Sequence, residues 1–392
     1  MAEAANIHIT TAFGEAVAVD RVPESDRSVF VASFKPYAAD HRYYEITKGA
    51  LEGRIEHYYL ILKDKQQRTR AVQPFLIVRQ DLVMGTPELV RRTSDAIRER
   101  LPGFLKLPML MVGCSAGEGD IALDVVSGDI DWTIDALAEA LPLIARRFKA
   151  MMMLFKDYPK AYRAKLDRLC DAGFTRIPSM PATGLKLDFR TFDEYLTQKL
   201  SHSMRKNLRR KFRKSESGIP IELTVLNDIT PFIGQILPLY QAVFGRAKQR
   251  FEQLNGLYFC QLGQEMGDRA RFLIWRQKDK IVAFASCLVH DGVLRDNYIG
   301  LDYSLAFEYH LYFLTWRDTV IWAMQNQCHT YHSAPLNYDP KFHFRMHLEP
   351  LDLYVKATGP LLNACFRPLL PILEPTRYDK TIQRFENAAE LW

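Results

Sequence analysis

The chain has 392 residues, more than one hydrophobic core usually contains, so its length predicts two domains. The composition is 48% hydrophobic, 25% charged and 12% aromatic. This balance excludes disordered, collagen-like, coiled-coil and disulfide-scaffold proteins. The formal net charge is only +6, but residues 199–214 hold eight Lys or Arg and no acidic residue. Local charge is therefore more informative than the total.

The cysteines and the N-terminus predict a cytoplasmic location, in solution or peripherally on the inner face of the membrane. No leader precedes the first elements, and no apolar run reaches the roughly 18 to 20 residues that span a bilayer. The six cysteines form no CxxC pair and lie among apolar residues, which is typical of reduced core thiols. They are Cys114, Cys170, Cys260, Cys287, Cys328 and Cys365.

The hydrophobic periodicity predicts two successive sets of elements with the same order. In the first half a helix and a strand hairpin are followed by a helix, a strand, a helix and a Gly-Phe step into another strand. These elements fall at residues 38–51, 57–63, 71–78, 132–150, 151–155, 161–173 and 173–178. After a helix at residues 191–200, the second half repeats a helix, a hairpin, a strand, a long helix and two late strands. These fall at residues 233–247, 269–276, 280–289, 293–302, 310–327, 328–335 and 351–356. Hence the prediction is an α/β fold with residues 1–185 and 186–392 as separate domains.

The second half resembles an acyltransferase domain of the GNAT fold. The segment SHSMRKNLRRKFRKSESG, the hairpin FLIWRQKDKIVAFASCLV, a strand with Gly-Leu-Asp-Tyr and a long helix carry the likeness. More narrowly, the chain resembles the Fem-type aminoacyl transferases and their peptidoglycan-biosynthesis-like relatives, and LDRLCDAGFTRIP extends the likeness into the first half. The resemblance implies two tandem GNAT-like domains, each a twisted mixed sheet flanked by helices.

Two family features can be placed on this sequence. Members tend to end the second domain with a strand, a polar loop and a Lys, and SAPLNYDPKFHF puts Lys341 there, although the glycine that usually follows is missing. The loop that cradles the pyrophosphate of coenzyme A should fall at residues 301–310, which read LDYSLAFEYH without a glycine. A standard coenzyme A site is therefore not implied.

The basic run predicts a helix that docks through a narrow apolar stripe and presents cations elsewhere. Like charges without acidic partners repel one another unless an anion binds, although a solvated basic face is the simpler interpretation. Suitable anions are a coenzyme A phosphate, a carrier-protein arm, a tRNA acceptor stem or an anionic membrane surface, whereas sequence-specific nucleic acid is not expected. The candidate substrate-binding cations are Arg205, Lys206, Arg209 and Arg210.

A dense polar cluster follows the long helix. Acyl transfer to an amine needs a base and a group that stabilises the oxyanion, for which His332 and Lys341 are the candidates. The alternative is a polar strand end with structural histidines, and no metal site is expected from His343 and His347. Further members are His329, Tyr331, Asn337, Tyr338 and Asp339, of which Tyr331, Asn337 and Tyr338 are candidate substrate contacts.

The segment DNYIGLDYSLAFEYH supplies the remaining candidates. The resemblance implies that two strands separate here to admit the acyl donor, lined by Tyr298, Asp302 and Tyr303. Tyr303 is the candidate proton donor to the leaving thiolate, and His310 is a further contact. If buried, Asp302 or Glu308 would have a raised pKa and could replace His332 as the base.

Residues 357–375 form an apolar tail that prolines interrupt, so no long regular helix is expected. The tail either folds back on its domain or enters a membrane interface.

Together these features predict an amide-forming acyltransferase that moves an acyl group from acyl-CoA or another thioester to a primary amine, with no tightly bound cofactor. A lipid acceptor is expected, as in a bacterial ceramide synthase acting on a sphingoid base. The alternatives are a Fem-type transferase that uses aminoacyl-tRNA on cell-wall precursors and a non-catalytic scaffold that binds anions or membranes.

Overall fold

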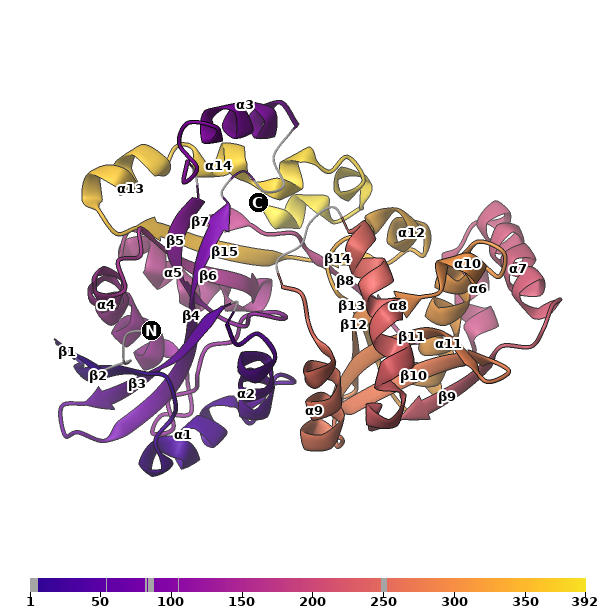
Figure 1. Ribbon diagram of the computed structural model, residues 1–392, viewed down its shortest axis with the longest axis horizontal. Helices are drawn as coiled ribbons and strands as arrows, with labels where there is room; N and C mark the ends of the chain where they lie inside the picture. Colours follow the sequence, from indigo (N-terminus) through magenta and orange to yellow (C-terminus); the bar gives the residue numbers. More distant parts are fainter. Residues whose placement is uncertain (1–5, 54, 82, 84–87, 105, 248–251) are drawn as a thin grey trace. The chain divides into compact units, whose positions relative to one another are not determined.

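The computed structural model describes residues 6–53, 55–81, 83, 88–104, 106–247 and 252–392, and the chain divides into two compact units (Figure 1). Unit 1 contains Met1–Pro181, Glu349–Gln383 and Ala389–Trp392, and unit 2 contains Ala182–Leu348 and Arg384–Ala388. Each unit has one mixed β-sheet flanked by helices. This confirms the predicted fold class of two tandem GNAT-like α/β domains.

Unit 1 is built on an eight-stranded sheet with the order β1-β2-β3-β4-β5-β6-β15-β7. Its strands are β1 (Ile7–Thr11), β2 (Gly14–Val19), β3 (Glu56–Asp64), β4 (Thr69–Asp81), β5 (Lys106–Val112), β6 (Met152–Pro159), β7 (Thr175–Pro178) and β15 (Leu351–Ala357). Its helices are α1 (Glu24–Phe34), α2 (His41–Ala50), α3 (Glu88–Arg98), α4 (Asp131–Arg147), α5 (Arg163–Asp171), α13 (Pro360–Phe366) and α14 (Leu370–Leu373).

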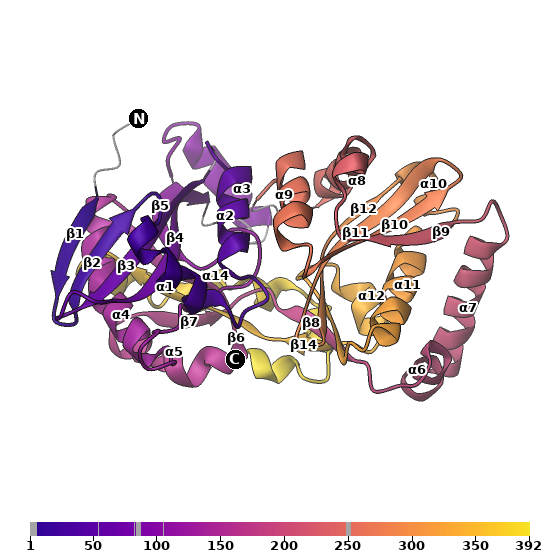
Figure 2. The same ribbon diagram turned by 90° about the horizontal axis from the view of Figure 1, so that it is seen from below.

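Adjacent tyrosines on β3 show how this sheet is covered on both faces. Successive strand residues point to opposite faces. Tyr59 packs edge-on against Phe30 of α1, while Tyr58 packs against Phe148 at the end of α4. Helices α1 and α2 therefore cover one face and α4 and α5 the other, as Figure 2 shows.

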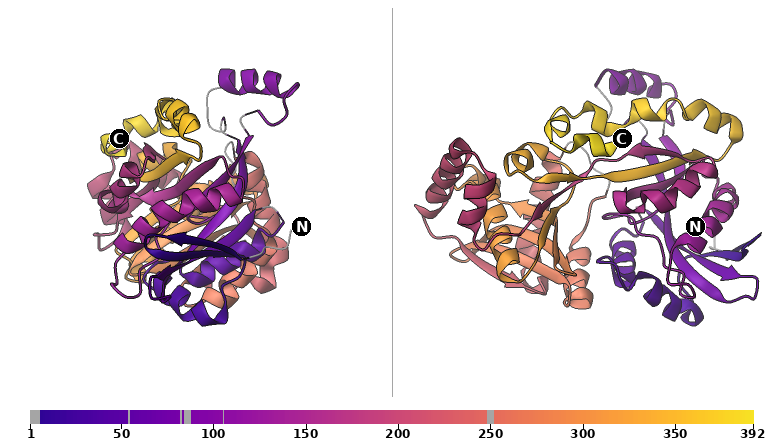
Figure 3. Two further views of the ribbon diagram at one scale, coloured as in Figure 1. Left: turned by 90° about the vertical axis from the view of Figure 1, so that its left-hand side faces the viewer. Right: turned by 180° about the vertical axis from the view of Figure 1, so that it is seen from behind.

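The late strand β15 lies inside the sheet of unit 1, between β6 and β7 (Figure 3). It pairs antiparallel with both neighbours, and its Asp352 accepts hydrogen bonds from Arg163 at 2.6 Å and Arg176 at 2.9 Å. The structure thus differs from the division predicted from sequence, which assigned all of residues 186–392 to the second domain. Strand pairing joins segments far apart in the chain, and a boundary drawn along the sequence does not detect it.

Unit 2 is built on a seven-stranded sheet with the order β14-β8-β13-β12-β11-β10-β9. Its strands are β8 (Ala182–Lys186), β9 (Glu222–Leu226), β10 (Ala270–Gln277), β11 (Lys280–His290), β12 (Val293–Leu301), β13 (Thr330–Ser333) and β14 (His347–Glu349). Its helices are α6 (Phe192–Lys199), α7 (His202–Glu216), α8 (Ile233–Arg246), α9 (Gly256–Met266), α10 (Tyr303–Ala306), α11 (Leu311–Gln325) and α12 (Tyr338–His343).

Two helical layers enclose the unit 2 sheet. Helices α8 and α9 cover one face, and α11 covers the other together with α6 and α7 (Figure 2). Trp316 of α11 stacks on Phe344 with ring centroids 3.7 Å apart, and Leu208 of α7 is buried in the same core. The predicted hairpin at 269–289, the strand at 293–302 and the long helix at 310–327 are all present. None of the described helices is both long and apolar enough to cross a bilayer.

Candidate active site

The sheet of unit 2 opens between β12 and β13. The two strands run parallel and pair from Val293 with Thr330 to Asp296 with Ser333, and there β13 ends. Strand β12 continues to Leu301, paired on its other side with β11. Within the part of the chain that the structure describes, no strand pairs with this edge of β12 after Asp296.

A β-bulge lies at the start of this opening. Asp296 pairs with Cys287 and Tyr298 with Ser286, so Asn297 is left without a partner in the ladder. A bulge reverses the alternation of side chains. As a result Asp296 points toward α11, while Tyr298 packs on the other face, against Tyr258 of α9.

Asp296 is the central carboxylate of the site. The Tyr331 hydroxyl donates to its Oδ2 at 2.8 Å, and the Cys287 thiol lies 3.9 Å from Oδ1. Burial raises the pKa of Asp296 to about 6, and the Tyr331 hydrogen bond and the nearby Lys341 charge oppose the shift. Asp296 is surrounded by protein yet keeps part of its surface accessible. A carboxylate of this kind is suited to exchange protons with a ligand near neutral pH.

Lys341 provides the cation of the site from α12. Its side chain is only 4% exposed, and its Nζ donates to the Ala334 carbonyl. Burial lowers the pKa of Lys341 to about 7, although the Asp296 charge favours the protonated form. Both groups thus change protonation close to neutrality, which is characteristic of functional sites.

The loop between β13 and α12 is backbone-strained. Leu336 has φ 78° and Asn337 has φ 53°, both in the left-handed region, which asparagine tolerates and leucine rarely adopts. The Asn337 side chain is hydrogen-bonded to Tyr312 of α11. Strain of this kind concentrates at functional sites, and here the loop leads directly to Lys341.

The candidates from the polar cluster fall on different sides of the sheet. Tyr331 is 2% exposed and touches Asp296, and Tyr338 is 3% exposed with its ring 5.8 Å from Lys341 Nζ. His332 is buried on β13, where strand alternation directs it to the face opposite Tyr331.

The candidates at the other end of β12 form a separate group. Asp302 follows the end of β12, six positions after Asp296, a distance of roughly 20 Å along an extended chain. Asp302 caps α10 and pairs with Lys280 at 2.6 Å. Tyr303 lies under the guanidinium of Arg246, 3.9 Å from its ring centroid, so it is not beside Lys341.

The two reserve bases do not have the predicted environment. Glu308 is exposed, whereas a reserve base would need to be buried. Asp302 is only partly buried, and although desolvation acts to raise its pKa, hydrogen bonds from Lys280 and Ser304 hold the pKa below its ordinary value. Asp302 therefore does not have the raised pKa expected of a buried carboxylate, because Lys280 and Ser304 compensate its charge.

Two further candidates have other contacts. The Tyr298 hydroxyl donates to Glu252 at 3.0 Å within an aromatic cluster. His310 has a left-handed backbone with φ 48° just before α11. Partial burial lowers its pKa, and the charges of Lys211 and Lys214 act in the same direction.

Helix α7 contains the basic run and begins with a Ser201 cap that accepts from the Met204 amide. Arg205 donates to the carbonyls of Thr197 and Leu200 at the end of α6, and Arg209 pairs with Asp193 at 2.6 Å. Arg210 donates to Asn207, one turn earlier on the helix. The predicted substrate-binding cations are thus partly engaged within unit 2.

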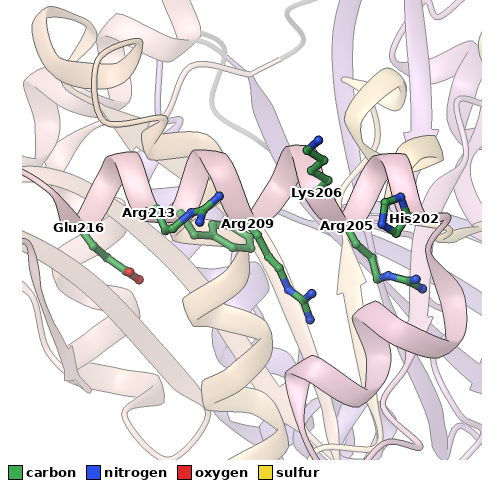
Figure 4. Close-up of a pocket in the computed structure, with 7 residues that line it drawn as sticks. His202, Arg205, Lys206, Arg209, Arg213 and Glu216 are labelled. Atoms are coloured by element: carbon green, nitrogen blue, oxygen red, sulfur yellow. The ribbon is translucent and has the colours of Figure 1, made fainter.

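A shallow groove of about 480 Å³ runs along the outer side of α7 (Figure 4). Lys206 and Arg213 line it and form no ion pair within the part of the chain that the structure describes. The lining residues are His202, Arg205, Lys206, Arg209, Phe212, Arg213 and Glu216. Their spacing places them on one side of a helix, which predominantly presents positive charge.

Sequence reasoning placed Lys341 and Tyr331 at the site but gave no role to Asp296 or Tyr312. The available signal for Asp296 was a single carboxylate inside an otherwise strand-like run, VLRDNYIGL. Tyr312 gave no signal, because an aromatic residue on an apolar helix is typical of a position in the hydrophobic core.

Residues 142–333, just under half of the chain, match the FemAB-like family model described as peptidoglycan biosynthesis/recognition. No curated protein matches the sequence.

Among solved structures, the chain is similar to L-PGS from Bacillus licheniformis, with 12% identity over 91% of this chain and 98% of that one and a TM-score of 0.52. It is similar to FemX, with 11% identity over 86% and 96% and a TM-score of 0.50. A Bacteroides thetaiotaomicron protein of unknown function also has a TM-score of 0.50, with 12% identity over 87% and 98%. Such identities establish a shared fold.

Proposed function

We propose that unit 2 transfers an acyl group from a thioester to a primary amine at the opening between β12 and β13. The observation that carries this proposal is the pair of Asp296 and Lys341. The pair belongs to the point where β12 and β13 separate, and burial brings the pKa of Asp296 to about 6 and that of Lys341 to about 7. Amide formation from an amine requires a proton acceptor and an oxyanion stabiliser at one place. The pair offers both.

The proposed reaction uses the protein's own groups for each proton. Asp296 accepts one proton from the bound ammonium group, and the freed nitrogen forms a bond to the carbonyl carbon. Protonated Lys341 stabilises the oxyanion of the tetrahedral intermediate. The carbon–sulfur bond then breaks, Lys341 donates its proton to the departing thiolate, and the resulting Lys341 amine takes the second proton from the nitrogen. The proton on Asp296 leaves to solvent along its accessible side.

Tyr331 serves as a positioning residue in this scheme. Its hydrogen bond fixes the carboxylate of Asp296 and favours the ionised form that accepts a proton. His332, the base candidate from the sequence, is buried on the same strand but on the face opposite Tyr331, so it is kept only as the alternative base.

The assay combines purified protein with acyl-CoA of several chain lengths and a panel of amines, including long-chain lipid amines such as sphingoid bases. Release of free thiol and formation of the amide are measured together. Lys341→Met should abolish both, whereas Lys278→Met, a substitution of an exposed lysine in the β10–β11 turn, should not. Equal activity of the two variants would contradict the proposal.

A second candidate is a Fem-type transfer from aminoacyl-tRNA, which the family match over residues 142–333 favours. Here the bond that breaks is the ester between amino acid and tRNA, and the acceptor is an amine of a cell-wall precursor. Activity with aminoacyl-tRNA, and none with any acyl-CoA, would decide for this donor while keeping the same site.

A further inference from the structure

The exposed half of α7 forms one continuous cationic surface. In addition to Arg205 and Arg209, whose charges are partly engaged, it carries Lys206, Arg213 and Lys214, which have no ion pair within the described part of the chain. Arg210 is exposed between them. The inward side of the helix packs on unit 2, where Leu208 is buried in the core, and Phe212 is buried at the boundary between this side and the groove. Glu216 at the end of the helix is the one acidic residue of α7, and it pairs with Arg317 at 2.6 Å.

Two large apolar side chains are exposed at the C-terminal end of this helix. Phe307 is 74% exposed and Ile219 is 42% exposed. Ile219 and Phe307 belong to the same region, because residues next to them in the chain are in contact: Gly218 lies directly against the Tyr309 ring. A second contact joins α7 to the start of α11: the Nζ of Lys211 lies 3.2 Å from the centroid of the Phe313 ring.

We infer that this surface, the exposed cations of α7 together with Ile219 and Phe307, docks unit 2 on an anionic lipid bilayer. We name it the α7 surface. A row of cations attracts anionic headgroups, and each Lys or Arg near such a membrane strengthens binding roughly five-fold. Exposed apolar side chains beside the cations then gain by entering the interfacial layer.

Charge alone would also attract RNA, but the apolar residues favour lipid. Single-stranded RNA is bound by aromatic side chains interleaved with the cations, on which bases stack. The aromatic residue of α7 is Phe212, and it is buried with 7% exposure. Phe307 lies beyond the end of the cationic row, where it can insert as an anchor but cannot interleave with the cations.

Docking through this surface does not depend on the proposed acyl transfer, and a binding assay without turnover tests it. The full chain is sedimented with phosphatidylcholine vesicles and with vesicles in which about one third of the lipid is phosphatidylglycerol. We expect binding only to the anionic vesicles, with an affinity that falls as salt rises. Equal binding to both vesicles, or no binding to either, would overturn the inference.

Two sets of variants assign the binding to this surface. Lys206→Glu, Arg213→Glu and Lys214→Glu together should weaken vesicle binding by at least about 100-fold. The matched control is Lys65→Glu, Lys106→Glu and Arg146→Glu, which changes the net charge equally at exposed cations of unit 1 and should retain binding.

For the apolar part, Phe307→Ser should weaken vesicle binding roughly ten-fold. The control Leu257→Ser changes an exposed apolar residue at the start of α9, which is not part of the α7 surface, and should not weaken binding. Circular dichroism of each variant verifies the fold. If the α7 triple variant binds vesicles as the parent does, the inference fails. It also fails if a short single-stranded RNA binds more tightly than the vesicles at the same salt and loses binding in that variant.

Discussion

The Tyr331 hydroxyl donates a 2.8 Å hydrogen bond to Asp296, although the two residues are 35 positions apart in the chain. In the parallel ladder Tyr331 pairs with Leu294, two residues before Asp296, and Asp296 pairs with Ser333 at the last pair, just before the strands separate. A carboxylate at this position is held by the sheet on one side and open to a ligand on the other. This relationship provides the first prediction.

Asp296→Asn should reduce turnover by roughly 10²- to 10⁴-fold, the usual contribution of a general base. The amide has nearly the same shape and can still accept from Tyr331, so folding should be retained. Initial rates of thiol release are measured at saturating amine, with His332→Gln as the comparison. A larger loss in His332→Gln than in Asp296→Asn would make His332 the base instead.

The pH dependence of kcat/KM should be bell-shaped and narrow. Below about pH 6 Asp296 becomes protonated and cannot accept the ammonium proton, and above about pH 7 Lys341 loses the charge that stabilises the oxyanion. Tyr331→Phe removes a hydrogen bond that lowers the pKa of Asp296, so the acidic limb should move to higher pH. If the pH profile of kcat/KM is the same in Tyr331→Phe as in the parent, the proposed effect of Tyr331 on the pKa of Asp296 is contradicted.

Lys341→Met should preserve or increase stability near neutral pH while activity is lost, because a buried lysine is replaced by an apolar side chain of similar length. In the folded protein the pKa of Lys341 is about 7, against 10.5 in the unfolded chain. Between these values the unfolded chain binds the proton more readily, so the free energy of unfolding rises with pH, by at most about 1.4 kcal/mol per pH unit. Urea denaturation across this window should show the rise in the parent and not in Lys341→Met.

Asp352→Ala should destabilise unit 1 by about 3 kcal/mol. The carboxylate is 1% exposed on β15 and binds Arg163 and Arg176, so its removal leaves two cations half-buried without their partner. The matched control is Asp171→Ala, an exposed carboxylate at the end of α5. Thermal unfolding followed by circular dichroism compares the two, and an equal midpoint would show that β15 does not depend on this cluster.

The sequence by itself determined the local elements and the fold class. The period of the apolar residues predicted the hairpin of β10 and β11 and the long helix α11, because these elements depend on neighbouring residues. Family resemblance placed Lys341 at the end of the second domain, and the run of cations identified α7. These inferences concern residues close together in the chain.

Only the tertiary structure decided which sheet contains β8 and β15, and only it decided the chemistry of the site. Strand β15 completes the sheet of unit 1, and β8, which follows unit 1 in the chain, lies between β13 and β14 in unit 2. The bulge at Asn297 puts Tyr298 on the face opposite Asp296, which an unbroken alternating pattern would not predict. Asp302 and Asp296 are six positions apart on one strand, yet a surface lysine lowers the pKa of the first while burial raises that of the second. A pKa depends on solvent and on charges brought near by folding, so residue type and spacing could not distinguish the two carboxylates.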